Sequence, residues 1–248
     1  MLKRSWTSTA AGMMHARVGG DPPPRDGTAV VLVHGLVISS RYMVPAAVEL
    51  APLCAVYAID LPGYGDSVKP RTMLGIGELA DALAAWMDAG DLRSAHLVAN
   101  SFGCQILAEF ALRHRDRVNR LVFQGPTVDP RARTMRQQLA RLALNSTREA
   151  PGLGWITLTD YRKAGFRRIR ATIRLAMEDR IEDKLPGIVA PTLVVRGERD
   201  PLVPQRWAEE VTRLLPRGEL RVLSGLGHTI NYTAPKEFVN AMRPFLGL

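Results

Sequence analysis

The chain has little cysteine, few aromatic residues and no long apolar run. Only two of its 248 residues are cysteines, Cys54 and Cys104. Both are expected to pack as reduced thiols in a reducing compartment, so a disulfide-stapled secreted scaffold is not expected. No stretch approaches the roughly 20 consecutive apolar residues of a membrane-spanning helix. We therefore expect no stable association with a membrane.

The first residues also lack the apolar run of a secretory signal. Lys3 and Arg4 supply basic charge there, but the residues after them are mostly polar. A cytoplasmic location is therefore expected. The sequence shows no cluster of metal ligands and no glycine-rich phosphate loop, so we expect neither a metal nor a cofactor.

Charge is unevenly distributed. The net charge of the chain is +9. Residues 127–188 carry 13 Lys and Arg against 7 Asp and Glu, so this segment alone contributes a net charge of +6. A solvated helical face accounts for such charge, and an anionic substrate or a membrane surface is the alternative. Aromatic residues are only 6% of the chain and do not alternate with the basic ones, so nucleic acid is not an expected partner.

Strand-like and helix-like patterns alternate along most of the chain. Strands are predicted at residues 13–18, 29–33, 55–60, 95–99, 120–124, 192–196 and 219–223. Helices are predicted at residues 40–51, 76–89, 102–113, 205–215 and 235–246. Most of the strands are apolar throughout, which is typical of strands buried on both faces. The pattern predicts an α/β fold with a mainly parallel sheet, helices on both faces and a functional site at the carboxyl ends of the strands.

One serine stands between a predicted strand and a predicted helix. Residues 98–103 read VANSFG, with Ser101 at the junction and small residues, Ala99 and Gly103, on either side. Such a run predicts a sharp turn that projects the serine hydroxyl from the end of the sheet. A helix N-cap is the alternative role for this serine.

An aspartate and a histidine follow in the places that a serine nucleophile requires. Asp200 lies just after the strand at 192–196, and His228 lies on the loop after the strand at 219–223. A histidine can take the serine proton, and a carboxylate can orient the imidazole. Asp129, which follows the strand at 120–124, is the alternative acid.

These motifs resemble those of the α/β-hydrolase superfamily along nearly the whole chain. The chain order serine, aspartate, histidine is that of its catalytic triad. Residues 30–35 (VVLVHG) and 60–67 (DLPGYGDS) resemble two further loops of the family. The resemblance implies that the backbone N–H groups of Leu36 and Phe102 form an oxyanion hole.

The resemblance also implies a division into two parts. Residues 1–126 and 187–248 would form the hydrolase core, and residues 127–186 would form a helical lid (cap) inserted after the sixth strand. Within the lid, residues 151–154 (PGLG) are predicted to separate helices. Residues near the motifs or on the lid are expected to line the substrate pocket, and they are His34, Val37, Asn100, Trp155, Tyr161 and Tyr232. For His34, support of the oxyanion loop is the alternative.

Several functions remain open on the sequence. The first hypothesis is hydrolysis of a carboxylic ester, lactone or thioester by way of an acyl-enzyme on Ser101, with a small carbonyl compound as substrate. Asn100 resembles the residue before the serine in hydrolases of ring-fission products, so cleavage of a carbon–carbon bond in a dienolic ketone acid is the second. A lyase, an acyltransferase or a ligand receptor on the same fold is the third.

Overall fold

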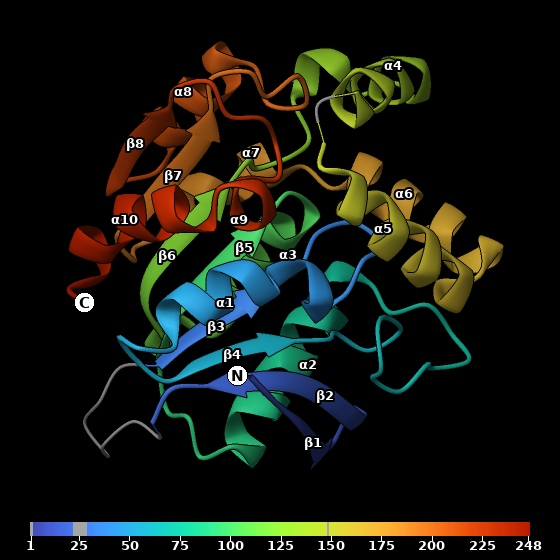
Figure 1. Ribbon diagram of the computed structural model, residues 1–248, viewed down its shortest axis with the longest axis vertical. Coiled ribbons are helices and arrows are strands. Elements are labelled where there is room, and N and C mark those ends of the chain that lie inside the picture. Colours follow the sequence, from blue (N-terminus) through green and yellow to red (C-terminus); the bar gives the residue numbers. More distant parts are fainter. Residues whose placement is uncertain (1, 22–28, 148) are drawn as a thin grey trace.

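The computed structural model describes residues 2–21, 29–147 and 149–248, and an eight-stranded sheet forms its centre (Figure 1). The order of the strands is β1-β2-β4-β3-β5-β6-β7-β8. β1 pairs with β2 and β2 with β4 in antiparallel fashion, and all the remaining pairs are parallel. The strands are β1 (Lys3–Thr9), β2 (Gly12–Gly19), β3 (Ala29–Val33), β4 (Val56–Ile59), β5 (Ala95–Asn100), β6 (Val118–Gln124), β7 (Thr192–Gly197) and β8 (Gly218–Leu223).

The predicted α/β fold and every predicted strand are confirmed. All residues of β3 and β5 are buried, as their continuous apolar sequences require of strands covered on both faces. β1 was not predicted, because its sequence KRSWTST is polar and has no apolar run. It forms at the edge of the sheet, where backbone pairing to β2 and one partly buried face are enough to hold it.

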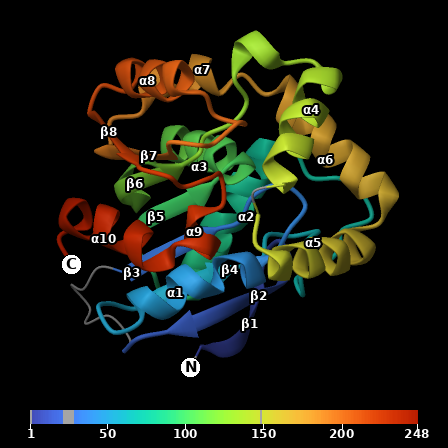
Figure 2. The same cartoon turned by 45° about the horizontal axis from the view of Figure 1, so that its top comes forward.

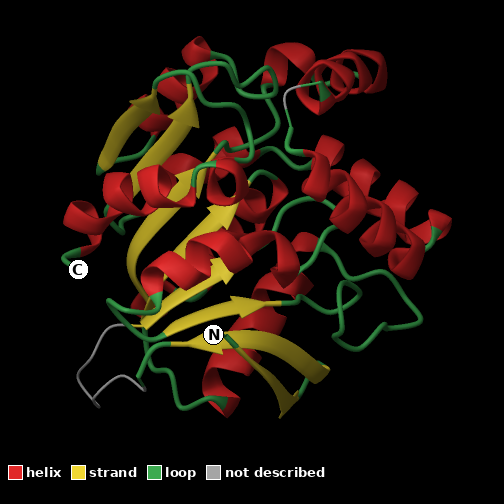
Figure 3. Ribbon diagram, viewed as in Figure 1, coloured by secondary structure: helices red, strands yellow, loops and turns green. Residues whose placement is uncertain are grey.

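Helices pack on both faces of the sheet (Figures 2 and 3). Side chains of α2, α3 and α8 belong to one apolar core and those of α1 and α10 to the other. In β3, Val31 faces the first core and Leu32 the second, as the alternation of a strand dictates. The helices that cover the two faces are α1 (Val44–Leu50), α2 (Ile76–Ala89), α3 (Phe102–Arg113), α8 (Gln205–Leu214), α9 (Ile230–Thr233) and α10 (Pro235–Leu246).

Between β6 and β7 the chain forms a separate group of helices beyond the carboxyl ends of the strands (Figures 1 and 2). They are α4 (Met135–Ser146), α5 (Pro151–Ala164) and α6 (Phe166–Glu178), and the short α7 (Ile181–Lys184) that follows them packs against α3 in the core. The prediction that residues 151–154 separate helices is wrong, because they form the first turn of α5. Proline is well accommodated there, since the first N–H groups of a helix have no intrahelical acceptor.

Hydrogen bonds hold this group of helices to the core. On α5, Asp160 accepts one from the Ser39 hydroxyl over 2.6 Å. On α6, the Thr172 hydroxyl lies 2.7 Å from that of Tyr64, and the Ala176 carbonyl accepts from Gln105 over 3.0 Å. None of the helices within the described ranges is long and apolar enough to cross a membrane.

Candidate active site

Ser101 has the backbone conformation that the sequence predicts for it. It joins β5 to α3 with backbone angles φ 54° and ψ −120°, which residues other than glycine rarely adopt. The adjoining helix passes very close to β3, because a Cβ atom on Gly103 would lie 2.7 Å from the carbonyl oxygen of His34. This close approach requires glycine at position 103 and leaves Ser101 on a sharp corner at the end of the sheet.

Asp200 and His228 lie in direct contact although 28 residues separate them in the sequence. Asp200 follows β7, and one of its carboxylate oxygens lies 2.7 Å from Nδ1 of His228. The other oxygen accepts hydrogen bonds from the backbone N–H groups of Leu202, over 2.8 Å, and Val203, over 3.1 Å. The carboxylate is therefore fixed by its own loop and turned toward the imidazole.

Nε2 of His228 is the free end of this pair. It is buried and has no hydrogen-bond partner among the described residues, and His228 lines the same cavity as Ser101. Burial by itself would lower the pKa of His228, but the charge and hydrogen bond of Asp200, with a contribution from Glu149, hold the pKa above its usual value. The imidazole is thus well placed to accept a proton at Nε2.

The alternative acid, Asp129, lies in a different environment. Its buried carboxylate is paired with Arg141, at 2.9 Å, and with Arg206. Burial opposes ionisation, but these two guanidinium groups hold the pKa of Asp129 below its usual value. Asp129 is therefore part of an ion-pair cluster with two arginines, whereas Asp200 contacts His228.

Gly125 is a site residue that the sequence did not single out. It follows β6 with φ 57°, and a Cβ atom there would lie 2.8 Å from Cε1 of His228 and 3.3 Å from the Asp200 carboxylate. Only a residue without a side chain leaves room for the imidazole. The glycine after a predicted strand was the available signal, but its meaning depends on what packs against it.

Asn100 belongs to a buried polar cluster behind the serine turn. Its side-chain oxygen accepts a hydrogen bond from the Tyr42 hydroxyl over 2.9 Å. Its amide nitrogen lies 3.5 Å from the carbonyl oxygen of His228, which also accepts from the side chain of Gln124. These contacts connect the serine and histidine loops. Tyr42 and Gln124 lie outside the sequence motifs, so no sequence signal identified them.

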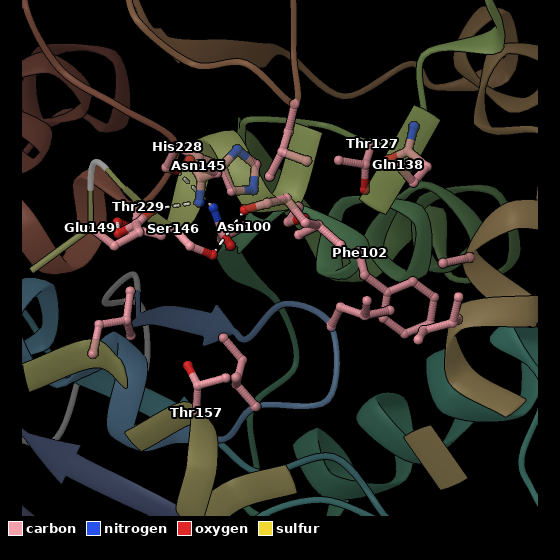
Figure 4. Close-up of a pocket in the computed structure, with 18 of the residues that line it drawn as sticks. Asn100, Phe102, Thr127, Gln138, Asn145, Ser146, Glu149, Thr157, His228 and Thr229 are labelled. Atoms are coloured by element: carbon pink, nitrogen blue, oxygen red, sulfur yellow. Dashed lines mark hydrogen bonds between the residues drawn. The ribbon is translucent and has the colours of Figure 1, made fainter. Parts of the chain in front are cut away.

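The cavity that contains Ser101 and His228 has a volume of about 630 Å³ and is lined mainly by apolar side chains (Figure 4). Much of its lining comes from α4, α5 and α6. Of the residues predicted to face the substrate, Leu36, Asn100, Phe102 and Tyr161 line it. Phe102 is the first residue of α3, so its N–H group has no intrahelical acceptor.

Four predicted pocket residues do not line this cavity: His34, Val37, Trp155 and Tyr232. Trp155 is 65% exposed, because Leu153 and Asp160 occupy the buried face of α5. Val37 is buried in the loop after β3, and Tyr232 stacks on Tyr42 at 6.3 Å between ring centroids.

His34 supports the loop after β3, the alternative that the sequence left open. Its Nδ1 lies 2.9 Å from the carbonyl oxygen of Gly35, and its Nε2 accepts a hydrogen bond from the Leu61 N–H over 3.2 Å. Burial lowers the pKa of His34 despite the nearby charge of Asp60. A neutral imidazole thus ties two loops together.

Charge inside the cavity differs in sign from charge on the surrounding helices. Among the described residues that line it, none is Lys or Arg, and Glu149 is the only one with an acidic side chain. The Glu149 carboxylate accepts hydrogen bonds from Asn145, over 2.7 Å, and from the hydroxyl of Thr229. Figure 4 shows Glu149, Asn145 and Thr229 close to His228.

Only one group within the described part of the chain has the spacing of metal ligands, and it consists of His15, Asp60 and Asp66. Its atoms already have partners in the protein. His15 Nδ1 lies 2.8 Å from Asp60, and Asp66 forms ion pairs with Arg4 at 2.7 Å and Lys163 at 2.8 Å. Arg4, Asp66 and Lys163 thus form an ion-pair network that links β1 to α5.

The fold agrees with comparisons to known proteins. The model of the "Alpha/beta hydrolase family" matches residues 30–241. The chain belongs to this family. The α/β-hydrolase relatives include RutD of Caulobacter sp. (strain K31), whose name provisionally assigns carbamate hydrolysis; it is 29% identical over 97% of both chains.

Two further relatives of this α/β-hydrolase have named activities. The 2-hydroxy-6-oxo-2,4-heptadienoate hydrolase of Pseudomonas putida F1 is 26% identical over 89% of both chains. The carboxylesterase YbfK of Bacillus subtilis (strain 168) is 27% identical over 95% of this chain and 84% of its own. A crystal structure of CesB (YbfK) from Bacillus subtilis superposes with a TM-score of 0.78 at 21% identity, covering 99% and 91% of the two chains. The chain is accordingly an α/β-hydrolase enzyme.

Proposed function

We propose that the chain is a serine esterase that cleaves carboxylic esters through an acyl-enzyme on Ser101. The observation that carries the proposal is the state of His228. Its Nδ1 is held by Asp200, whereas its buried Nε2 has no partner among the described residues, in the cavity that Ser101 also lines. A general base for a serine hydroxyl needs this arrangement.

The proposed reaction has two steps. In the first, the Ser101 oxygen attacks the ester carbonyl while His228 Nε2 accepts its proton, and then the imidazolium donates that proton to the leaving alcohol. In the second, His228 takes a proton from water as that water attacks the acyl-enzyme, and the imidazolium then returns the proton to the Ser101 oxygen as the acid is released. Asp200 stabilises the imidazolium throughout without changing its own protonation state.

We assign the oxyanion hole to the backbone N–H groups of Leu36 and Phe102. Both residues line the cavity beside Ser101, and the Phe102 N–H stands at the start of α3. A donor aimed at the oxyanion stabilises charge that develops only in the transition state. Loss of one such donor typically lowers the rate on the order of 100- to 1000-fold.

We also propose that residues 127–186 act as a lid over the hydrolase core. The support is that α4, α5 and α6 supply much of the cavity lining. Substrate selection would then depend on side chains such as Leu139, Leu158 and Met177. The lining favours a largely apolar acyl or alcohol group. The scarcity of cysteine supports a cytoplasmic location.

Carbon–carbon cleavage is the second candidate, supported by the 26% identity to the heptadienoate hydrolase. Substrates of that class carry a carboxylate, which is usually bound by a basic side chain. Among the described residues of the lining there is no Lys or Arg to bind it. Asn100, which resembles the corresponding residue of that group, is occupied by the bonds to Tyr42 and His228.

The experiment that tests the proposal combines labelling with turnover. We expect a fluorophosphonate probe to add once, on Ser101, as read by mass spectrometry of the intact protein. We expect p-nitrophenyl acetate, butyrate and octanoate to be hydrolysed, with Ser101→Ala abolishing both signals. His228→Ala should cost nearly as much as Ser101→Ala, because the two act as a unit.

Other outcomes would redirect the assignment. An adduct without ester turnover, together with turnover of a coloured dienolic ketone acid, would favour the second candidate. Turnover that persists in Ser101→Ala would contradict the nucleophile. Tight stoichiometric retention of a ligand without released product would indicate a receptor, and product formed only with an acceptor other than water would indicate an acyltransferase.

A further inference from the structure

The acidic side chain of Glu149 is placed where it can act on a bound substrate. It lies in the connection between α4 and α5 and lines the cavity together with Ser101 and His228. Its hydrogen bond to Thr229 joins it to the residue that directly follows His228. The carboxylate is therefore held in one position beside the reacting groups.

The charge of Glu149 has no cationic partner within the described part of the chain. Its hydrogen-bond donors, the Asn145 amide and the Thr229 hydroxyl, are both neutral. A carboxylate facing a mainly apolar cavity is costly unless a positive charge comes close to it. Among the described residues, the His228 imidazolium formed during catalysis lies near enough to interact with Glu149, and a cationic group of a bound ligand would supply a second positive charge.

We infer that Glu149 selects substrates by charge, favouring an ester that carries an ammonium group and rejecting one that carries a carboxylate. This inference rests on the proposed esterase function. The rings of Tyr42 and Tyr161, which line the same cavity, offer further favourable contacts to an ammonium group. The basic charge of residues 127–188 does not oppose this selection, because none of the described cavity residues is Lys or Arg.

The test compares two esters of the same shape that differ by one charge. Butyrylcholine and 3,3-dimethylbutyl butyrate differ only by a quaternary nitrogen in place of a carbon. We expect the wild-type enzyme to show a higher kcat/KM for the choline ester. Glu149→Gln keeps the size of the side chain and removes its charge, and it should lower this preference about tenfold, the effect of one partly desolvated charge pair.

A matched control separates the local effect from the change in net charge. Glu178 on α6 is exposed and pairs with Arg174 at 2.7 Å, and it does not line the cavity. Glu178→Gln should leave the preference for the choline ester unchanged. A hemisuccinate ester of p-nitrophenol should be a poor substrate of the wild type and should improve in Glu149→Gln only.

A binding measurement makes the inference independent of turnover. Choline and 3,3-dimethylbutan-1-ol, the two product alcohols, are titrated calorimetrically into wild type, Ser101→Ala and Glu149→Gln. We expect choline to bind more tightly than its carbon analogue except in Glu149→Gln. Equal affinities in all three proteins, or an unchanged kcat/KM ratio while p-nitrophenyl butyrate is hydrolysed, would overturn the inference and leave the esterase proposal standing. If the protein shows neither turnover nor labelling but still binds choline more tightly than its carbon analogue, the esterase proposal is overturned and the role of Glu149 in binding a cation stands.

Discussion

At the scale of single residues, two aspartates that follow neighbouring strands differ in the side chains that their carboxylates contact. Asp200 contacts His228 at 2.7 Å, whereas Asp129 is buried between Arg141 and Arg206. Both carboxylates are fixed by backbone N–H donors, so their local sequence does not distinguish them. The distinction arises because the loop with His228 lies beside Asp200, whereas Arg141 of α4 and Arg206 of α8 lie beside Asp129.

Exchanging each aspartate for asparagine should therefore have opposite consequences. We expect Asp200→Asn to lower kcat by about 10⁴-fold, as loss of the orienting carboxylate does in a serine protease triad, with little change in stability. Asp129→Asn should keep most of the activity and lower the free energy of unfolding by about 2–4 kcal/mol, because two arginines lose their partner. Urea denaturation and p-nitrophenyl butyrate assays on both variants check this, and the reverse pattern would assign the acid to Asp129.

The raised pKa of His228 predicts where activity is lost in acid. The imidazole must be neutral to accept the serine proton, so kcat/KM should fall as the pH drops through a value above the usual 6.5 of histidine. Because the charge of Glu149 contributes to this rise, Glu149→Gln should move the acid limb to lower pH. A pH profile of kcat/KM for a neutral ester measures it, with Glu178→Gln as the variant in which the limb should not move.

At the scale of elements, the site depends on glycines where strands and helices meet closely. Gly103 lets α3 pass the end of β3, and Gly125 leaves room for the imidazole at the end of β6. The first contact holds two elements together, whereas the second involves only the site. Substitution at the two positions should therefore affect different properties.

Alanine at these glycines tests that difference. Gly103→Ala should lower the free energy of unfolding by about 1–3 kcal/mol, because its Cβ would meet backbone of β3. Gly125→Ala should lower kcat at least tenfold by displacing His228, with a smaller loss of stability. Thermal unfolding and turnover are the measurements. Gly90→Ala, whose Cβ would meet only ordinary contacts, is the control and should change neither.

The elements themselves were mostly predictable. α2, α3 and α10 begin and end at the predicted residues, because their apolar faces and the strand or loop signals beside them are local. The polar β1 and the first turn of α5 were not predictable. Pairing with β2 decides the former, and packing of α5 against the core decides the latter.

At the scale of the whole molecule, the buried histidines that remain neutral set a pH dependence of stability. Burial and the charge of Arg120 lower the pKa of His96 from 6.5 to about 4. Below pH 6.5 the unfolded chain binds a proton at His96 that the folded chain does not. The free energy of unfolding therefore decreases as the pH is lowered, down to about pH 4, where the folded protein also binds this proton. His34, whose pKa is also lowered, adds to the same trend.

We therefore expect the protein to be less stable at pH 5 than at pH 7, and His96→Gln to reduce this loss. The reduction should be about 1 kcal/mol after allowance for partial screening by solvent. Urea denaturation curves at the two pH values give the difference for each protein. An identical loss in wild type and His96→Gln would show that His96 does not contribute.

The amino-acid sequence alone predicts the α/β architecture, the turn at Ser101 and the candidate positions Asp200 and His228. These follow from local patterns: apolar runs for buried strands, small residues beside a serine, and loops after strands. The folded structure is needed to show that Asp200 rather than Asp129 contacts His228, that Gly125 must lack a side chain, and that Glu149 faces the cavity. Each of these depends on contacts between residues far apart in the chain, and strand order and packing set such contacts.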